Sequence, residues 1–207
     1  MKKNSYTLKH NKTPDDIKKH KALRGLRCYV SSFFHHKHRI HPDSNTCERI
    51  TEVINKMSSS GKNVALLTYC KARHSAIIFC ERDTWSIVSA YGDGVVYYGD
   101  LCHEQLVDII YRESTGWKDT IKMSNVVYIG GLNIISMEQY INEFASVNKF
   151  KIFTNNCSRF AANVLIAGSG QQKGFFTHDR PCQMPANTLE LAKEIDRFLQ
   201  KRRGIVR

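Results

Sequence analysis

The chain has 207 residues, a formal net charge of +12 at pH 7 and 42% hydrophobic residues. That hydrophobic fraction can build a core, so the composition excludes a wholly disordered chain. No run of 18 apolar residues occurs, and the residues after Met1 are polar. We therefore expect neither a transmembrane helix nor a cleaved signal peptide.

The basic charge is concentrated at the N-terminus. Residues 1–41 hold 11 Lys and Arg against Asp15 and Asp16, and they contain six of the nine histidines. We interpret residues 1–44 as a basic, mobile arm that precedes a domain at 45–207. The arm has three open interpretations: a solvated segment compatible with export, attachment to an anionic membrane surface, and nonspecific nucleic-acid contact. Nucleic acid ranks last, because the remainder shows no basic recognition helix and no aromatic RNA-binding motif.

Metal and disulfide chemistry are both disfavoured by the sequence pattern. The histidines within 35–41 lie in the basic arm, where we interpret them as charge and predict no metal site. Cysteines occur at positions 28, 47, 70, 80, 102, 157 and 182. Their odd number and the absence of Cys-x-x-Cys pairs favour free thiols in a reducing compartment.

The predicted elements follow one another closely from residue 46 onward. The hydrophobic pattern predicts a helix at 46–57 and then four strands joined by short turns, at 64–70, 74–80, 85–91 and 95–101. It next predicts a helix at 103–112, a strand at 123–129, a helix at 137–147, a short strand at 150–153 and a helix at 157–167. A last helix begins at Asn187, which has a capping-box spacing to Glu190. This order predicts an α+β fold with an antiparallel sheet packed against helices.

Cys157 is the strongest candidate for a catalytic residue. It follows a pair of asparagines and opens an apolar helix. Unpaired N–H groups and the partial positive charge of a helix start favour a thiolate there. The same N–H groups, with Asn155 or Asn156 as a side-chain donor, are suited to holding an oxyanion.

A nucleophilic thiol also needs a base and a group that orients it. His74 begins a predicted strand after a polar segment, and we predict that it is the base. For the orienting group we choose Asp93, in the turn that follows the next strand. Asp100, Asp83, Ser89 and a backbone carbonyl remain open alternatives.

The order of these motifs resembles a known superfamily. The sequence contains Arg73-His74-Ser75, then Asn156-Cys157-Ser158 opening a helix, then Pro185-Ala186-Asn187 before the last helix. This pattern resembles the circularly permuted papain-like superfamily, related to the NlpC/P60 and lecithin:retinol acyltransferase groups. It is most similar to bacterial effector and toxin domains such as the Rho-inactivation domain and IcsB. The resemblance implies a permuted papain-like fold and acyl transfer through a thioester.

The resemblance also implies a biological setting. We expect a secreted bacterial effector that acts in host cytoplasm or at host membranes and acylates lysines of a host protein, with a membrane-associated small GTPase as the sharpest candidate. No cofactor is expected, and acyl-CoA would be a substrate. The alternatives are a cysteine peptidase or amidase of the same mechanism, and a basic adaptor without enzymatic activity in which Cys157 is structural.

Overall fold

The computed structural model describes residues 44–69, 74–81, 84–91, 94–116, 125–147 and 156–204. The basic segment at 1–43 and the strand expected at 150–153 lie outside these residues. All other predicted helices and strands are found, with end points that differ by a few residues.

Five antiparallel strands form one sheet in the order β4-β3-β2-β1-β5. They are β1 (Val64–Tyr69), β2 (His74–Glu81), β3 (Thr84–Tyr91), β4 (Gly94–Leu101) and β5 (Val126–Ile129). The first four form the predicted meander, in which each strand pairs with the one before it. β5 returns to the free side of β1. The prediction of an antiparallel α+β fold is therefore confirmed, whereas the finer papain-like assignment is not.

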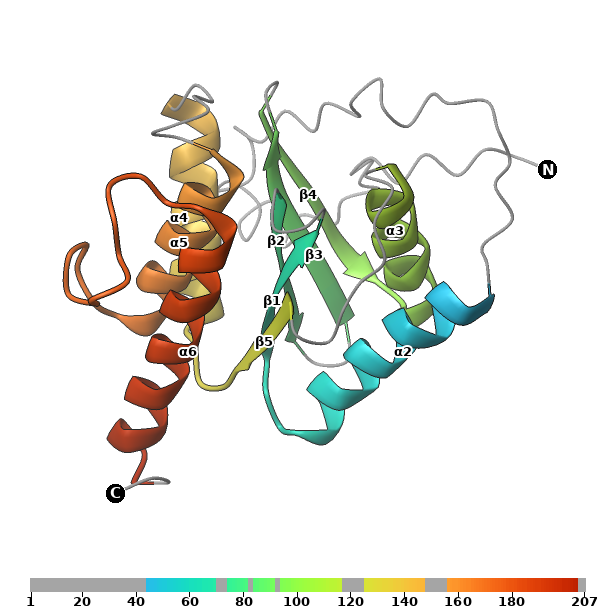
Figure 1. Cartoon of the computed structure of the whole chain (residues 1–207), viewed down its shortest axis with the longest axis horizontal. Coiled ribbons are helices and arrows are strands. Elements are labelled where there is room, and N and C mark those ends of the chain that lie inside the picture. The colour runs from blue at the N-terminus through green and yellow to red at the C-terminus, as the bar shows by residue number, and fades with distance from the viewer. Residues whose placement is uncertain are drawn as a thin grey trace, which may run out of the picture.

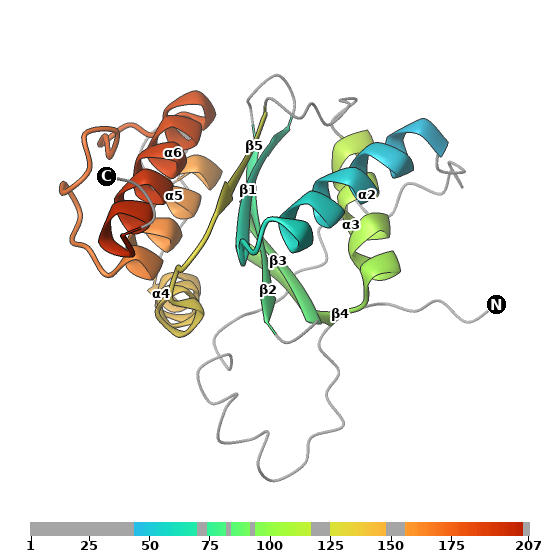
Figure 2. The ribbon, with the colours of Figure 1, turned by 90° about the horizontal axis from the view of Figure 1, so that it is seen from below.

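Helices cover both faces of the sheet. On one face lie α2 (Ser44–Ser59) and α3 (His103–Gly116), and on the other lie α4 (Ile134–Val147), α5 (Cys157–Ser169) and α6 (Pro185–Arg202) (Figure 1). The perpendicular view shows the same three layers, with the sheet between the two groups of helices (Figure 2). Each face of the sheet therefore has its own apolar core.

The alternation of side chains along β2 decides which helices each residue meets. Ile77 and Phe79 belong to the core beneath α4–α6, whereas Ala76 and Ile78 belong to the core beneath α2 and α3. Successive strand residues point to opposite faces. Since β2 carries apolar residues on both faces, it is buried on both sides.

Helix α6 begins earlier than the sequence predicts. Its first residue is Pro185, and its N-cap is Met184, whose side chain makes no capping hydrogen bond. Proline suits the first helical position because its fixed φ matches the helix and its missing N–H would lack an intrahelical partner there. The expected cap at Asn187 is therefore wrong, because that residue already lies inside the first turn.

Helix α5 also extends beyond its predicted end at residue 167, through Gly168 to Ser169. Gly168 is helical, and Gly170, with a φ of 71°, forms the C-cap. A Cβ atom at Gly168 would lie 2.7 Å from Cγ of Met137 on α4. Gly168 thus allows α4 and α5 to approach closely, and the left-handed residue that ends the helix is Gly170.

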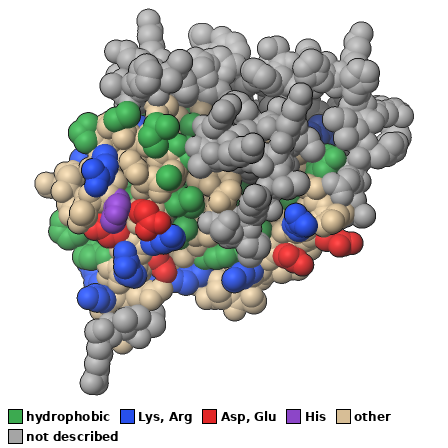
Figure 3. Space-filling view, viewed as in Figure 1, with side chains coloured by type: hydrophobic (Ala, Val, Ile, Leu, Met, Phe, Trp, Pro, Cys, Tyr) green, Lys and Arg blue, Asp and Glu red, His purple; other side chains and the backbone are tan. Residues whose placement is uncertain are grey.

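The described residues are nearly neutral in charge. They include 12 Lys and Arg against 13 Asp and Glu, so the excess positive charge of the chain belongs to the other residues. On the face seen in Figure 3, acidic and basic side chains are interspersed, and hydrophobic side chains lie over the α4–α6 layer. None of the described helices combines the length and apolarity that a membrane span requires.

Candidate active site

Asn156 and Cys157 start helix α5 as predicted. Asn156 is the N-cap, and its Oδ1 atom accepts a hydrogen bond from the N–H of Arg159 at 2.8 Å. Its Nδ2 atom donates to the carbonyl of Gln183 at 3.0 Å. Both the oxygen and the nitrogen of the amide therefore form hydrogen bonds within the protein, which explains why asparagine occupies this cap. The oxyanion role of Asn156 stays a prediction, and that of Asn155 lies outside the described residues.

The thiol of Cys157 is buried, with 7% of the residue exposed. Burial raises its pKa, while hydrogen bonds from the backbone N–H of Ser75, from the hydroxyl and N–H of Ser158 and from its own N–H lower it. The pKa stays above its usual value because burial outweighs these bonds. The resting form at neutral pH is thus the protonated thiol, and not the thiolate that the helix start alone would favour.

Two buried serines join the strand to the helix beside this thiol. The Oγ atoms of Ser75 and Ser158 are 3.2 Å apart, and both residues are buried. The carbonyl of Ser158 also accepts a hydrogen bond from the hydroxyl of Thr188 on α6, at 3.4 Å. The start of α5 is therefore held between β2 and α6.

His74 lies next to Ser75 in the chain, but the strand directs its side chain differently. Because Ser75 points toward α5, the alternation of β2 places the imidazole of His74 on the face of α2 and α3. The residue is 2% exposed, and burial lowers its pKa to about 4. His74 is therefore a neutral imidazole near pH 7. Its pairing with Cys157 stays a prediction that requires the ring to turn around the end of the sheet.

The candidates for the orienting group fall in three places. Asp93 and Asp83 lie outside the described residues. Asp100, near the end of β4, has a positive φ of 55°. Ser89, on the face of α2 and α3, donates to Oε1 of Glu113 at 3.2 Å, and both of these residues are buried.

Glu113 is a buried carboxylate that the sequence reasoning missed. It is 4% exposed, and it lies on the same face of the sheet as the expected direction of His74. A signal was present in the sequence. Glu113 follows Ile109 by four residues and Ile110 by three, so helical periodicity places it on the buried stripe of α3.

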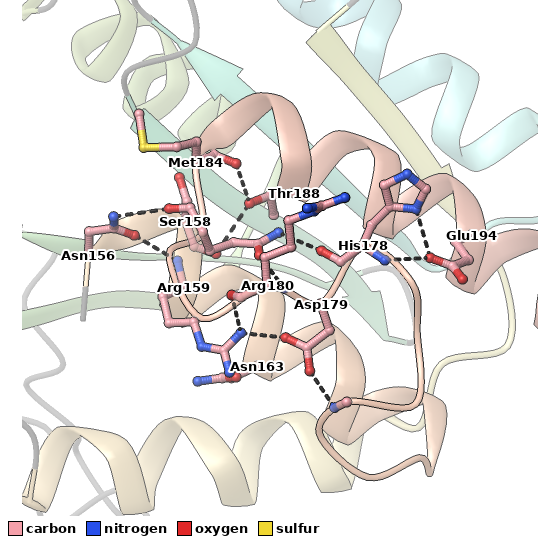
Figure 4. Close-up of polar contacts among 12 residues, drawn as sticks. Asn156, Ser158, Arg159, Asn163, His178, Asp179, Arg180, Met184, Thr188 and Glu194 are labelled. Atoms are coloured by element: carbon pink, nitrogen blue, oxygen red, sulfur yellow. Dashed lines mark hydrogen bonds and ion pairs between the residues drawn. The ribbon is translucent and has the colours of Figure 1, made fainter. Parts of the chain in front are cut away.

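A long loop, residues 170–184, is fixed against α5 and α6 by two carboxylates (Figure 4). Asp179 pairs with Arg159 of α5 and also accepts the N–H of Gly174 at 2.6 Å. Glu194 of α6 accepts the N–H groups of Thr177 at 2.9 Å and His178 at 3.0 Å, and its Oε2 atom lies 2.9 Å from Nδ1 of His178. These contacts hold the middle of the loop. The hydrogen bond from Asn156 to the carbonyl of Gln183 holds the end of the loop at the start of α5.

A separate depression lies against α6 and β5, away from Cys157. It has a volume of about 330 Å³ and is lined by Val127, Glu190, Lys193, Asp196 and Arg197. Lys193 pairs with Glu190, and Asp196 pairs with Lys62. Its charged groups largely neutralise one another, so we do not connect it with the thiol.

Metal chemistry was not expected from the sequence. Among the described residues, no group of three or more His, Cys, Asp and Glu side chains is arranged to hold a metal ion. The cysteines that the structure describes, at positions 47, 80, 102, 157 and 182, form no disulfide with one another.

Comparisons of the chain with protein-family models, with curated proteins and with solved structures return no match. The papain-like resemblance therefore rests on its motifs alone, and the site is interpreted from its own geometry.

Proposed function

We propose that the protein is a thiol-dependent acyl-transfer enzyme with Cys157 as its nucleophile. The observation that carries this proposal is the position of Cys157 as the first residue of α5, directly after the N-cap Asn156, with the Ser75–Ser158 hydroxyl pair holding that helix start against β2. Hydrogen bonding from the backbone of Ser75 and Ser158 acts to lower the pKa of its thiol. Donors already aimed at one point stabilise negative charge as it develops, with little reorganisation. Such charge forms first on the sulfur and then on the oxygen of a tetrahedral intermediate.

The proposed reaction begins from two neutral groups, because burial disfavours both the thiolate and the imidazolium. After the His74 ring has turned from the face of α2 and α3 toward the start of α5, the sulfur of Cys157 attacks the acyl carbonyl carbon as its proton passes to His74. The tetrahedral intermediate collapses to a thioester, and His74 returns the proton to the leaving group. With acyl-CoA as donor, the leaving group is the coenzyme thiol. A lysine amine, or water, then attacks the thioester and restores the thiol.

The acceptor proposed here follows from the resemblance. A lysine of a host protein such as a small GTPase at a membrane would receive the acyl group from a secreted effector. The basic residues 1–44 would attract the protein to anionic lipid. Peptide or amide hydrolysis by the same residues is the related alternative, and detection of new peptide termini would identify it.

A non-enzymatic adaptor is the second candidate function, and three observations favour it. The raised pKa and burial of Cys157, together with the direction of His74, also fit a thiol that serves only packing. The two functions differ in whether His74 affects the reactivity of Cys157.

The test is the alkylation rate of each cysteine against pH, read by peptide mass spectrometry. Cys102, which is exposed, is the internal reference. With general-base assistance, we expect His74→Ala to slow alkylation of Cys157 at pH 7 by about tenfold or more and to leave Cys102 unchanged. Equal rates at Cys157 in the wild type and in His74→Ala would refute the pair and favour the adaptor.

A further inference from the structure

β5 is one edge of the sheet, and the pairing of β1 determines which backbone groups of β5 face outward. The N–H of Cys80 in β2 donates to the carbonyl of Asn63, so Asn63 directs its backbone groups toward β2. Because this direction alternates along a strand, Val64 and then Leu66 direct theirs toward β5. Figure 2 shows β5 at the margin of the sheet, between α6 and α2. β5 therefore has one side bonded to β1 and one side directed outward.

The same alternation divides the residues of β5 into two sets. Val127 and Ile129 lie opposite the two β1 residues that face β5, and they bond to them. The N–H and C=O groups of Val126, Tyr128 and Gly130 consequently point away from the sheet. These three residues form the outer edge.

Side chains of α6 already take the outward groups of Gly130. Its N–H donates to Oδ1 of Asp196 at 3.2 Å, and its carbonyl accepts from Nη2 of Arg203 at 2.7 Å. Among the residues that the structure describes, no group takes the outward N–H and C=O of Tyr128 or Val126. An added strand thus has these two residues to bond to, and it ends before Gly130.

The opposite edge of the sheet, β4, is less suited to pairing. Its register with β3 shifts between the pairs Trp85–Leu101 and Ile87–Tyr98, and Asp100 in this stretch has a φ of 55°. A bulge of this kind bends an edge strand and interrupts regular pairing. β5 instead keeps one register with β1 throughout.

We propose that β5 is a dimerisation strand, which pairs antiparallel with β5 of a second copy of this chain and joins the two sheets. A two-fold axis at Val127 places Val126 of one copy opposite the partner's Tyr128. This register uses both outward residues of each copy and avoids Gly130. The inference goes beyond the proposed function and is independent of the chemistry of Cys157.

Helix α6 gives the reason to choose a second copy as the partner. Glu190, Lys193 and Arg197 line the depression of about 330 Å³ beside Val127, and the C-cap of α6 binds Gly130. α6 and β5 therefore run in the same direction, so the two-fold axis reverses both. It directs Glu190 of each copy toward Arg197 of the other. A patch that carries both charges in this order is complementary to itself, whereas a partner of one charge would meet a like charge.

Reversal of these charges tests the arrangement in the full chain. Sedimentation velocity would measure dimer dissociation over a range of protein concentrations, in enough salt to screen the net charge of +12. We expect Glu190→Lys to weaken the dimer by about tenfold or more, because the symmetry places the repulsion twice in the interface. Glu190→Lys combined with Arg197→Glu should restore the dissociation constant to within about threefold of the wild type.

Glu104→Lys is the matched control for the charge reversal. Glu104 is exposed on α3, which packs over β3 and β4 at the other side of the sheet. It should leave the dissociation constant unchanged.

A second pair of variants tests the backbone contact. Tyr128→Pro removes an outward N–H, which an edge strand tolerates, and it should weaken the dimer by about tenfold or more. Tyr128→Ala removes the ring and its contact with Lys56 but keeps the N–H, so it should retain the dimer. If Tyr128→Pro does not fold, the charge reversal decides alone.

Three results would overturn the proposal. The first is a wild-type protein that stays monomeric at every concentration. The second is a dimer that Glu190→Lys and a folded Tyr128→Pro leave intact. The third is a combined charge reversal that fails to restore the dimer.

Discussion

The hydroxyl oxygens of Ser75 and Ser158 lie 3.2 Å apart and join the second residue of β2 to the second residue of α5. Both residues are buried, so neither hydroxyl can exchange this bond for water. The pair fixes where the first turn of α5 packs along β2. It thereby places the sulfur of Cys157 within reach of the N–H of Ser75.

The serine pair should therefore contribute to stability as a unit. Removing one hydroxyl leaves the other buried, so Ser75→Ala or Ser158→Ala alone should cost about 1–3 kcal/mol of the free energy of unfolding. The double variant should cost clearly less than the sum of the two. Urea unfolding of all four proteins measures this. Additive losses would mean that the two hydroxyls do not interact.

The buried His74 should make stability depend on pH. Its folded pKa of about 4 is below the usual 6.5, so the unfolded chain binds a proton more readily between these values. The fold therefore keeps its full free energy of unfolding above pH 6.5, where the ring is neutral in both states. That free energy falls by about 3 kcal/mol as the pH drops to 4. Urea unfolding of wild-type protein and of His74→Gln across this window tests the effect.

The glutamine variant should lose most of that pH dependence, although its stability at pH 7 will also change because a buried ring is replaced. His178→Gln is the matched control, because His178 is only partly buried. If His74→Gln keeps the wild-type slope between pH 6.5 and 4, the ring does not titrate as its burial requires.

Loop 170–184 should loosen when its ion pair is broken. The carboxylate of Asp179 is nearly fully buried beside Arg159. Arg159→Met would leave that charge uncompensated, at a cost of about 3 kcal/mol in the free energy of unfolding. Amide exchange within the loop should accelerate, as mass spectrometry can show. Arg180→Met, at an exposed position, should leave both properties unchanged, and equal effects of the two variants would argue against a specific role for the pair.

The sheet could be predicted from the sequence because short apolar runs alternate with turn residues. The face of β2 on which the His74 side chain lies could not be predicted from the sequence. Ile77 and Ile78 are both apolar, so a period of two does not reveal which face of β2 each one meets. That face is decided only when α5 covers one side of the sheet, which is a tertiary property.

The start of α6 illustrates a competition between local signals. Asn187 and Glu190 have the spacing of a capping box, but Pro185 suits the first helical position and the helix begins there. Met184 consequently becomes the cap, although it is a poor capping residue.

Glu113 of α3 was missed for another reason. A charged residue is normally expected at the surface, even where helical periodicity places it on the apolar stripe.

The most direct test of Cys157 as nucleophile is a covalent acyl-enzyme. Wild-type protein, Cys157→Ser and His74→Ala would be incubated with a long-chain acyl-CoA, and peptides would be examined by mass spectrometry before and after hydroxylamine. We predict a hydroxylamine-labile acyl group on Cys157 of the wild type. In His74→Ala, the same acyl group should form at least about 100-fold more slowly. Acylation that is confined to the exposed Cys102 and Cys182, or that proceeds equally in Cys157→Ser, would contradict the proposed function.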